Sequence, residues 1–218
     1  MQLAKRSWSE RFWDWLVSRT RIEPFITSRV PRHALNPIYC LGGTTFLLFV
    51  VLAVTGILLA VYYKPTPEAA YESVETITKT VPYGWLVRSL HFYGANGMLI
   101  LAVLHMVRVY CTGSYKAPRE LNWVGGVLLG LLTLFSGYTG YVLRWDQEAV
   151  GASGVGQGIT TSLPYIGSLI GSTLWGRGYA DTLSRYYASH LLLVPGIMII
   201  LMAIHFWMVR RHGISGPL

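Results

Sequence analysis

Four histidines lie in two pairs inside long apolar stretches of the sequence. His91 and His105 are 14 residues apart, and His190 and His205 are 15 residues apart. Because an α-helix turns about 100° and rises about 1.5 Å per residue, the two members of a pair return to nearly the same helix face, about 20 Å apart along the axis. Ionisable side chains inside a membrane segment are costly and mark functional sites.

The two pairs indicate metal chemistry at two depths. If the helices that carry them run in the same direction, the first histidines of both pairs share one depth and the second histidines share the other. Two facing imidazoles at each depth form a bis-histidine set, which suits haem iron in electron transfer. A single buried histidine is often only a hydrogen-bonded core residue, but four paired in depth are harder to explain by packing. Zinc would not use two ligand sets about 20 Å apart.

Glycines repeat this spacing on the other two apolar stretches. Gly42 and Gly56 are 14 residues apart, and so are Gly126 and Gly140. A porphyrin wedged between four helices needs close approach of the backbone at its edges, which glycine permits. Each glycine alone would also fit ordinary packing of membrane helices.

Two arginines stand three residues outside the first pair of histidines. Arg88 precedes His91, and Arg108 follows His105. They are candidates for pairing with haem propionates, which would otherwise be buried charges. The alternative is that both side chains snorkel to the lipid headgroups.

Membrane-spanning helices must position these residues. Hydrophobic residues make up 52% of the 218 residues and charged residues 13%, against about 25% charged in soluble domains. A helix of about 20 apolar residues crosses the hydrocarbon core. The sequence therefore predicts an all-α membrane protein, a single four-helix bundle over residues 1–218, with spans at about 38–63, 84–111, 121–143 and 183–210.

The segments outside the spans have their own patterns. Residues 7–20 place aromatic side chains at helical spacing between charges, which predicts an N-terminal amphipathic surface helix at the membrane interface or on a partner subunit. The 64–82 loop carries three prolines. The 144–181 loop is long enough to be functional, and we expect short interfacial helices at about 150–162 and 166–175.

The net charge of +8 lies on one side of the predicted membrane. Both termini and the 111–122 loop carry twelve basic and four acidic residues, whereas the other side carries six of each. By the positive-inside rule, both termini face the cytoplasm or its equivalent, the negative side. The basic charge therefore serves membrane orientation, and nucleic-acid binding is not expected.

Several motifs are more specific: NPIYCLGG (36–43), YGWLVRSLHFYGA (83–95), LHMVRVYCTGSYKAPRELNWVGGV (104–127), GYTGYVLRWDQ (137–147), LPYIG (163–167), LSRYYASH (183–190) and HFWMVRRHGISGPL (205–218). With them, residues 31–218 resemble cytochrome b6, the short, split form of cytochrome b in quinol–cytochrome c or quinol–plastocyanin oxidoreductases. The 15-residue spacing in the last span also resembles the split type rather than the longer mitochondrial type, which typically has 14.

The resemblance implies two b-type haems. His91 and His190 would ligate the lower-potential haem near the positive side. His105 and His205 would ligate the higher-potential haem near the negative side.

The resemblance also implies a third haem. Cys40 falls where this family forms a single thioether bond to an extra c-type haem beside the inner b haem, on the quinone-reducing face. Arg210 falls where the family places a basic residue near that haem or its quinone. Cys111 has no such role and is interpreted as packing.

The implied activity is bifurcated quinol oxidation coupled to proton translocation. One electron would go to an iron–sulfur protein and on to a c-type cytochrome, and the other would cross the membrane through the two haems to reduce quinone. The family's Pro-Glu-Trp-Tyr quinol motif does not occur here, and split members carry it on a second subunit. The chain would therefore be one subunit of a complex in a bacterial plasma membrane or thylakoid, not active alone. Expected partners are a second cytochrome b-family subunit with three further spans, a Rieske iron–sulfur protein, a c-type cytochrome and a second copy in a homodimer.

Two departures from the family pattern lie near the expected quinol pocket. Arg144 stands where the family usually has proline before the Trp-Asp pair, and residues 148–162 are rich in glycine. The shape of that pocket and the quinone type therefore stay open. Two other functions are also open at this point, namely a di-haem membrane anchor of a dehydrogenase or hydrogenase and a haem-free transporter whose histidines relay protons. The glycine pairs and YCLGG argue against the membrane anchor, and a transporter would not need the 14-residue spacing of the glycines.

Overall fold

The computed structural model describes residues 7–9, 11–13, 40–176 and 178–213, and within these ranges the regular structure is entirely helical. Four helical segments are long and apolar enough to cross a membrane: Leu41–Ala60, Gly84–Cys111, Glu120–Val142 and Tyr179–His212. The predicted all-α membrane fold is therefore confirmed.

The helices follow one another with short connections. In chain order they are α3 (Leu41–Ala60), α4 (Ala70–Lys79), α5 (Gly84–Cys111), α6 (Glu120–Val142), α7 (Gln147–Thr161), α8 (Gly167–Leu174), α9 (Tyr179–Ala188), a π-helical turn (Ser189–Leu193) and α10 (Val194–His212). Residues 8–9 and 11–13 are also helical, and the rest of the predicted 7–20 surface helix lies outside the described residues.

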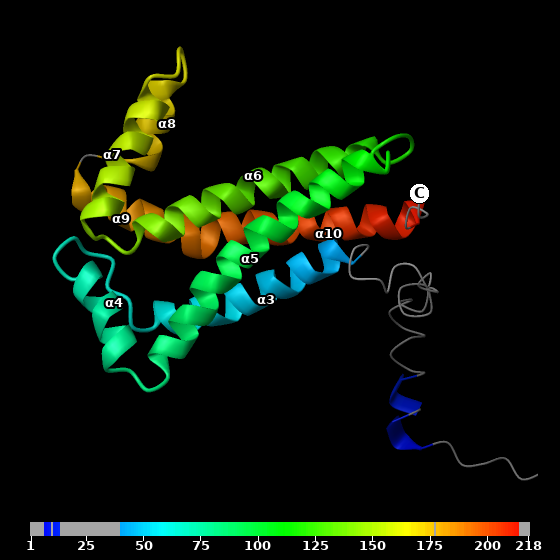
Figure 1. The fold of residues 1–218 in the computed structure, drawn as a ribbon, viewed down its shortest axis with the longest axis horizontal. Helices are drawn as coiled ribbons and strands as arrows, with labels where there is room; N and C mark the ends of the chain where they lie inside the picture. Colours follow the sequence, from blue (N-terminus) through cyan, green and yellow to red (C-terminus); the bar gives the residue numbers. More distant parts are fainter. Residues whose placement is uncertain (1–6, 10, 14–39, 177, 214–218) are drawn as a thin grey trace, which may run out of the picture.

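The four spans alternate in direction, which gives the bundle two different ends (Figure 1). Helix α3 packs along α5, α6 packs on α10, and α5 also contacts α6. Helices α4, α7, α8 and α9 gather at the end where α3 finishes, and α7 and α8 project from the bundle there. The turn from α5 to α6 and the end of α10 lie at the opposite end.

The outer surface of the bundle is apolar. Leu47 and Ile57 on α3 are 60% and 64% exposed, and many other large apolar side chains of the spans are exposed as well. Hydrocarbon tolerates such a surface, and a helix satisfies its own backbone polar groups there. Only a minority of the side chains in each span is buried within the chain. The histidines of the candidate site are at inward-facing positions, where they are partly shielded by neighbouring helices.

Helix α4 occupies the 64–82 segment, for which the sequence analysis identified only three prolines. Ala70, Ser73 and Ile77 are buried at the i, i+3, i+7 spacing of a helix face. Glu75 and Lys79 form an ion pair one turn apart on this helix. The hydrogen bond with Lys79 lowers the pKa of Glu75 and raises that of Lys79.

A cluster of large side chains closes the end of the bundle where α4 lies. Its buried members are Ala70, Val142, Trp145, Trp175, Leu183 and Tyr186. Tyr63, which packs against this cluster, donates a hydrogen bond to the carbonyl of Leu143 at 2.8 Å. Burial raises the pKa of Tyr63, with a smaller contribution from Tyr187, so the hydroxyl keeps the proton that it donates. This contact ties the chain after α3 to the end of α6.

Candidate functional site

The first histidines of the two pairs meet at one end of the bundle. His91 lies on α5 and His190 lies in the π-helical turn before α10. Their ring centroids are 6.2 Å apart and their planes cross at 71°. Because a metal ion binds an imidazole nitrogen at about 2.0 Å, two rings on opposite sides of one ion have centroids about 6 Å apart. The two side chains are therefore spaced as a bis-histidine pair.

The hydrogen bonds of His91 fix which of its nitrogens is available. Its Nδ1 lies 2.9 Å from the Thr55 hydroxyl oxygen, and that hydroxyl donates its own proton to the carbonyl of Val51 at 2.7 Å. Since a hydroxyl has one proton, Thr55 must accept from Nδ1–H. The unprotonated nitrogen of a neutral His91 is then Nε2, the nitrogen that would bind a metal.

His190 is held in the same way by α6. Its Nδ1 lies 3.0 Å from the carbonyl oxygen of Ser136 and 3.1 Å from the Thr139 hydroxyl. A carbonyl oxygen only accepts, so Nδ1 carries the proton and Nε2 is again left for a metal. Outer hydrogen bonds of this kind orient metal-binding histidines and fix their tautomer.

The 15-residue spacing of His190 and His205 depends on the π-helical turn. In a regular α-helix 15 residues overshoot four full turns by about 60°, whereas 14 residues fall about 40° short. The turn at Ser189–Leu193 holds one extra residue, as π-helical turns do. The spacing therefore acts as 14 residues, the spacing on α5, and both helices present their histidines with the same periodicity.

Each of the four predicted glycines faces one of the four histidines. A Cβ atom added to Gly56 would lie 3.1 Å from Cε1 of His91, and one added to Gly140 would lie 2.7 Å from Cε1 of His190. At the other end the corresponding distances are 3.0 Å from Gly42 to His105 and 3.4 Å from Gly126 to His205.

The glycines thus let the imidazole rings lie flat against the neighbouring helix. The sequence analysis expected porphyrin edges at these positions, and the described contacts are with the ligand rings themselves. A side chain at Gly42, Gly56 or Gly140 would displace an imidazole, whereas a methyl group at Gly126 would be in ordinary contact with His205. The common spacing of the glycines and histidines therefore has one cause, which is that each glycine helix supports both histidines of the span that it packs against.

The second histidines line a cavity between the four spans. About 600 Å³ of space not filled by atoms lies between these residues, including the part on its open side. His105 and His205 contribute to it from α5 and α10. The other lining residues are mostly glycine, methionine and phenylalanine: Gly42, Phe46, Phe49, Met98, Met106, Gly126, Gly130, Met198, Met202 and Phe206.

This donor set fits haem. The cavity offers two imidazoles, flat and flexible apolar walls, and two hydroxyl side chains, Thr45 and Thr133. Such a lining suits an apolar macrocycle bound through its metal and excludes water from it. The histidines also form no larger cluster, since the described residues contain no group of three or more His, Cys, Asp or Glu side chains arranged around a metal ion.

The predicted arginines lie in different surroundings. Arg88 donates a hydrogen bond to the Thr78 hydroxyl on α4 at 3.0 Å, so its described contact is with that helix. Arg108 is half-buried one turn beyond His105, and Arg210 is exposed in the last turn of α10.

Cys40 lies at the end of the bundle that carries the cavity. It is the residue before α3, and its thiol is free and exposed. It stands two residues from Gly42, which contacts His105. Its Sγ would lie 3.1 Å from a Cβ atom on Gly43, so the second glycine of the Leu-Gly-Gly sequence makes room for the sulfur.

Thr55 and Thr139 are functional residues that the sequence analysis missed. Each directly precedes one of the histidine-facing glycines, in the repeated dipeptides Thr55-Gly56 and Thr139-Gly140. This repeated Thr-Gly dipeptide was the sequence signal that could have identified the two threonines. Gly42 and Gly126 have no threonine before them, so the repeat marks only one end of the bundle.

The chain is similar in sequence and in fold to known proteins. The sequence profile described as cytochrome b/b6/petB matches residues 26–213. The chain belongs to the cytochrome b/b6 family. Cytochrome b6 of Mastigocladus laminosus is 42% identical over 212 residues, with 94% of this chain and 98% of the relative covered. Cytochrome b6 of Heliobacterium modesticaldum is 46% identical over 212 residues, with 94% and 100% covered.

A solved structure of this cytochrome b/b6 type agrees in fold. A chain of the structure described as "Hyperthermophilic respiratory Complex III" is 29% identical and superposes with a TM-score of 0.80 over 94% of the present chain. The present chain spans only 56% of that longer chain.

Membership in the family settles the class of function. The protein is a haem-binding cytochrome b subunit of a quinol oxidoreductase of the bc/b6f type, and the family implies b-type haems. A dehydrogenase anchor and a haem-free transporter are therefore set aside.

Proposed function

We propose that this subunit carries electrons across the membrane between a quinol-oxidising site at the His91/His190 end and a quinone-reducing site at the Cys40 end. The observation that carries the proposal is the paired geometry of the histidines, 6.2 Å apart at one depth and lining one cavity at the other. Two bis-histidine haems, when bound, supply reversible one-electron chemistry closed to other ligands. The electron acceptor of the whole complex is a c-type cytochrome or plastocyanin.

The residues of the chain hold and tune these cofactors. His91 and His190 serve as ligands through Nε2, because their Nδ1 protons are engaged by Thr55 and by α6. His105 and His205 ligate the second haem within their apolar cavity. The surrounding helices exclude water, and low polarity around a haem is one means by which a protein sets its potential.

Cys40 is the attachment point of a third, c-type haem. Its exposed thiol at the start of α3 is accessible for a thioether bond, and it lies at the same end as the second histidine pair. Arg210, exposed in the last turn of α10, is then a cation near that haem and the quinone. Arg108, half-buried beyond His105, is the candidate partner of a propionate.

The subunit works inside a larger complex. The likeness to cytochrome b6 and to a complex III chain supports a second cytochrome b-family subunit with three further spans as a partner. A Rieske iron–sulfur protein, a c-type cytochrome and a second copy of the complex complete the proposed assembly. Both termini lie on the negative side, since the basic residues concentrate there.

Counting haems by type tests this proposal. The complex is purified, its haems are extracted with acidified solvent, and pyridine haemochrome spectra are recorded for the extract and the residue. We expect two extractable b haems and one covalent haem per chain. Cys40→Ala is expected to lose only the covalent haem, and the matched variant Cys111→Ala none. Two b haems without a covalent one would remove Cys40 from the site, and a haem-free complex would refute the proposal.

Activity gives the second test. The complex is expected to reduce its cytochrome or plastocyanin with quinol and to release protons on one side of a sealed vesicle. His91→Ala is expected to abolish this activity with loss of one b haem. His212 is not one of the four paired histidines, so His212→Ala should retain both haems.

A further inference from the structure

The turn between α6 and α7 is held in a conformation that its residues do not favour. Helix α6 ends at Val142 and α7 begins at Gln147. Between them Trp145 has φ = 53°, a left-handed conformation that bulky residues rarely adopt. Its ring is buried, only 8% exposed, and packs edge-on against Tyr179 at 6.0 Å. Such a backbone persists only where several surrounding contacts enforce it.

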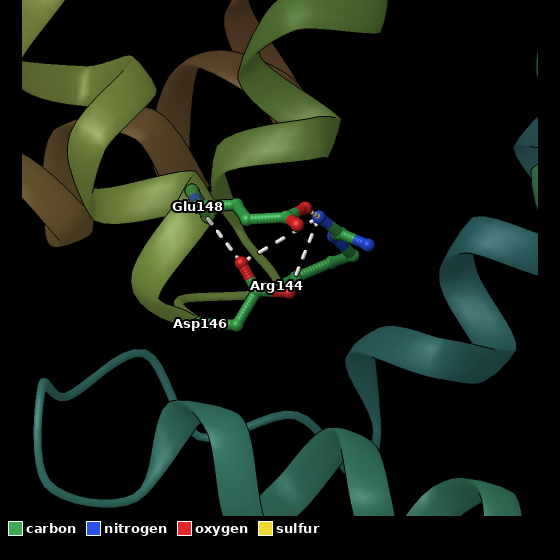
Figure 2. Close-up of polar contacts among 4 residues, drawn as sticks. Arg144, Asp146 and Glu148 are labelled. Carbon is green, nitrogen blue, oxygen red and sulfur yellow. Dashed lines mark hydrogen bonds and ion pairs between the residues drawn. The ribbon is translucent and has the colours of Figure 1, made fainter.

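Arg144 adds contacts on both sides of Trp145 (Figure 2). Its Nη2 lies 3.1 Å from Oδ2 of Asp146 and 3.4 Å from Oε2 of Glu148. Its guanidinium also lies over the ring of Tyr141, 4.5 Å from the centroid. One side chain therefore links the last turn of α6 to the first turn of α7.

The carboxylate that Arg144 contacts is the cap of α7. Oδ1 of Asp146 accepts a hydrogen bond from the backbone N–H of Ala149 at 2.8 Å, so this side chain serves both the helix start and the arginine. Both acids also stand at the helix N-terminus, where the helix dipole favours negative charge. Fixing Asp146 consequently fixes the direction in which α7 leaves the bundle.

Proline would not substitute for this arginine. Leu143 has φ = −64° and ψ = −13°, an α-helical conformation that a following proline disfavours. The backbone N–H of Arg144 also donates to the carbonyl of Tyr141 at 3.3 Å, and proline has no such proton. The turn is therefore held by charge and hydrogen bonding rather than by a rigid ring.

We propose that Arg144 is a positioning residue for quinol binding, because its contacts with Asp146, Glu148 and Tyr141 set the placement of α7 and α8 at the His91/His190 end. This inference rests on the proposed quinol-oxidising site at that end. Arg144 touches no reacting group in this role. It acts by keeping the projecting α7–α8 segment in one arrangement beside the proposed quinol site.

The test measures quinol KM and kcat separately in the intact complex. Arg144→Gln removes the charge, Arg144→Lys keeps it without the planar fork, and Arg144→Pro probes a rigid turn. Glu148→Gln is the matched control, because Glu148 is 77% exposed and its loss leaves the Asp146 contact intact. All rates are compared with the wild type at the same ionic strength, which cancels the salt dependence of cytochrome docking.

We expect Arg144→Gln to raise the quinol KM about three- to tenfold with kcat within about twofold. The effect should be smaller for Arg144→Lys, smallest for Glu148→Gln and at least as large for Arg144→Pro. The ratio of variant to wild-type KM should shrink at high salt, since salt weakens the ion pairs of the wild type. Both b-haem spectra should be unchanged.

Hydrogen exchange of peptides covering residues 143–155 supplies a readout independent of turnover. The N–H of Ala149 is expected to exchange faster in Arg144→Gln than in the wild type. An unchanged KM in this variant, or a fall in kcat or haem content at constant KM, would overturn the proposal. A wild-type complex that does not oxidise quinol would instead refute the proposed function on which it rests.

Discussion

The two histidine sites of this protein are built from the same parts but differ in how tightly the ligands are held. At the His91/His190 end, threonines and a backbone carbonyl engage both Nδ1 atoms. At the other end, Nδ1 of His205 is buried without a hydrogen-bond partner among the described residues, although the backbone of Asn122 lies close. That end also has the methionine-lined cavity.

The difference indicates two ways of building a haem site in one bundle. The first end is preorganised, since its ligand tautomers and ring positions are fixed by contacts within the chain. The second end has room and flexible side chains, because methionine adapts its shape to what it surrounds. An adaptable site suits an end that is proposed to accommodate an additional haem and quinone.

Single-residue deletions in the last span should have the largest effect on this comparison. Deleting Ile199 rotates His205 by about 100° relative to His190, so we expect at least one b haem to be lost from the complex. Deleting Leu192 removes the extra residue of the π-helical turn and should keep both haems. Haem content per chain is the measurement, and equal losses from the two deletions would contradict the role assigned to the turn.

Glycine-to-alanine substitutions should separate the two ends. Gly140→Ala places a methyl group 2.7 Å from Cε1 of His190, whereas Gly126→Ala places one 3.4 Å from Cε1 of His205. The first ring is fixed by hydrogen bonds and cannot yield, so most of that haem should be lost. The His205 ring would be in ordinary contact with the new methyl group, so its haem should be retained. Redox titration of each b haem checks this, and a variant pair with the opposite order would argue against the preorganised first end.

Removing a threonine hydroxyl should produce a smaller effect on one haem. Thr55→Val deletes the acceptor for Nδ1 of His91, and loss of such an outer hydrogen bond typically weakens metal binding about 10–100-fold. Thr45→Val is the matched control, because Thr45 lines the cavity at the His105/His205 end and donates to the carbonyl of Leu41. Haem retention during chelating or detergent washes and the midpoint potentials provide the readout. Equal behaviour of the two variants would show that the threonine does not hold the ligand.

The smallest expected effect concerns the contact between α3 and α6. Tyr63→Phe removes the hydrogen bond to Leu143 and should lower the stability of the complex by about 1 kcal/mol with both haems kept. Tyr62→Phe, at a neighbouring exposed tyrosine, should change nothing. Thermal unfolding in detergent, followed by loss of the haem spectrum, compares the two.

The sequence by itself determined the four spans and the pairing of the histidines. A membrane leaves few backbone solutions, and helices of about 20 apolar residues are the simplest of them. Once His91 and His105 are on a helix, the helical period decides that they share a face. The predicted second span, 84–111, agrees with α5 at Gly84–Cys111, and the predicted short helices near 150–162 and 166–175 correspond to α7 and α8 with bounds shifted by up to three residues.

Tertiary structure decided what local patterns do not contain. Helix α4 is short and amphipathic, so its formation depends on packing against α5 rather than on its own propensity. The hydrogen bond between Thr55 and His91, the resulting choice of Nε2 in His91 and the contact of Gly140 with His190 all depend on residues far apart in the chain. The sequence supplied the period on each helix, but only the packing of α3 on α5 and α6 on α10 decided which glycine supports which histidine and how firmly each ring is held.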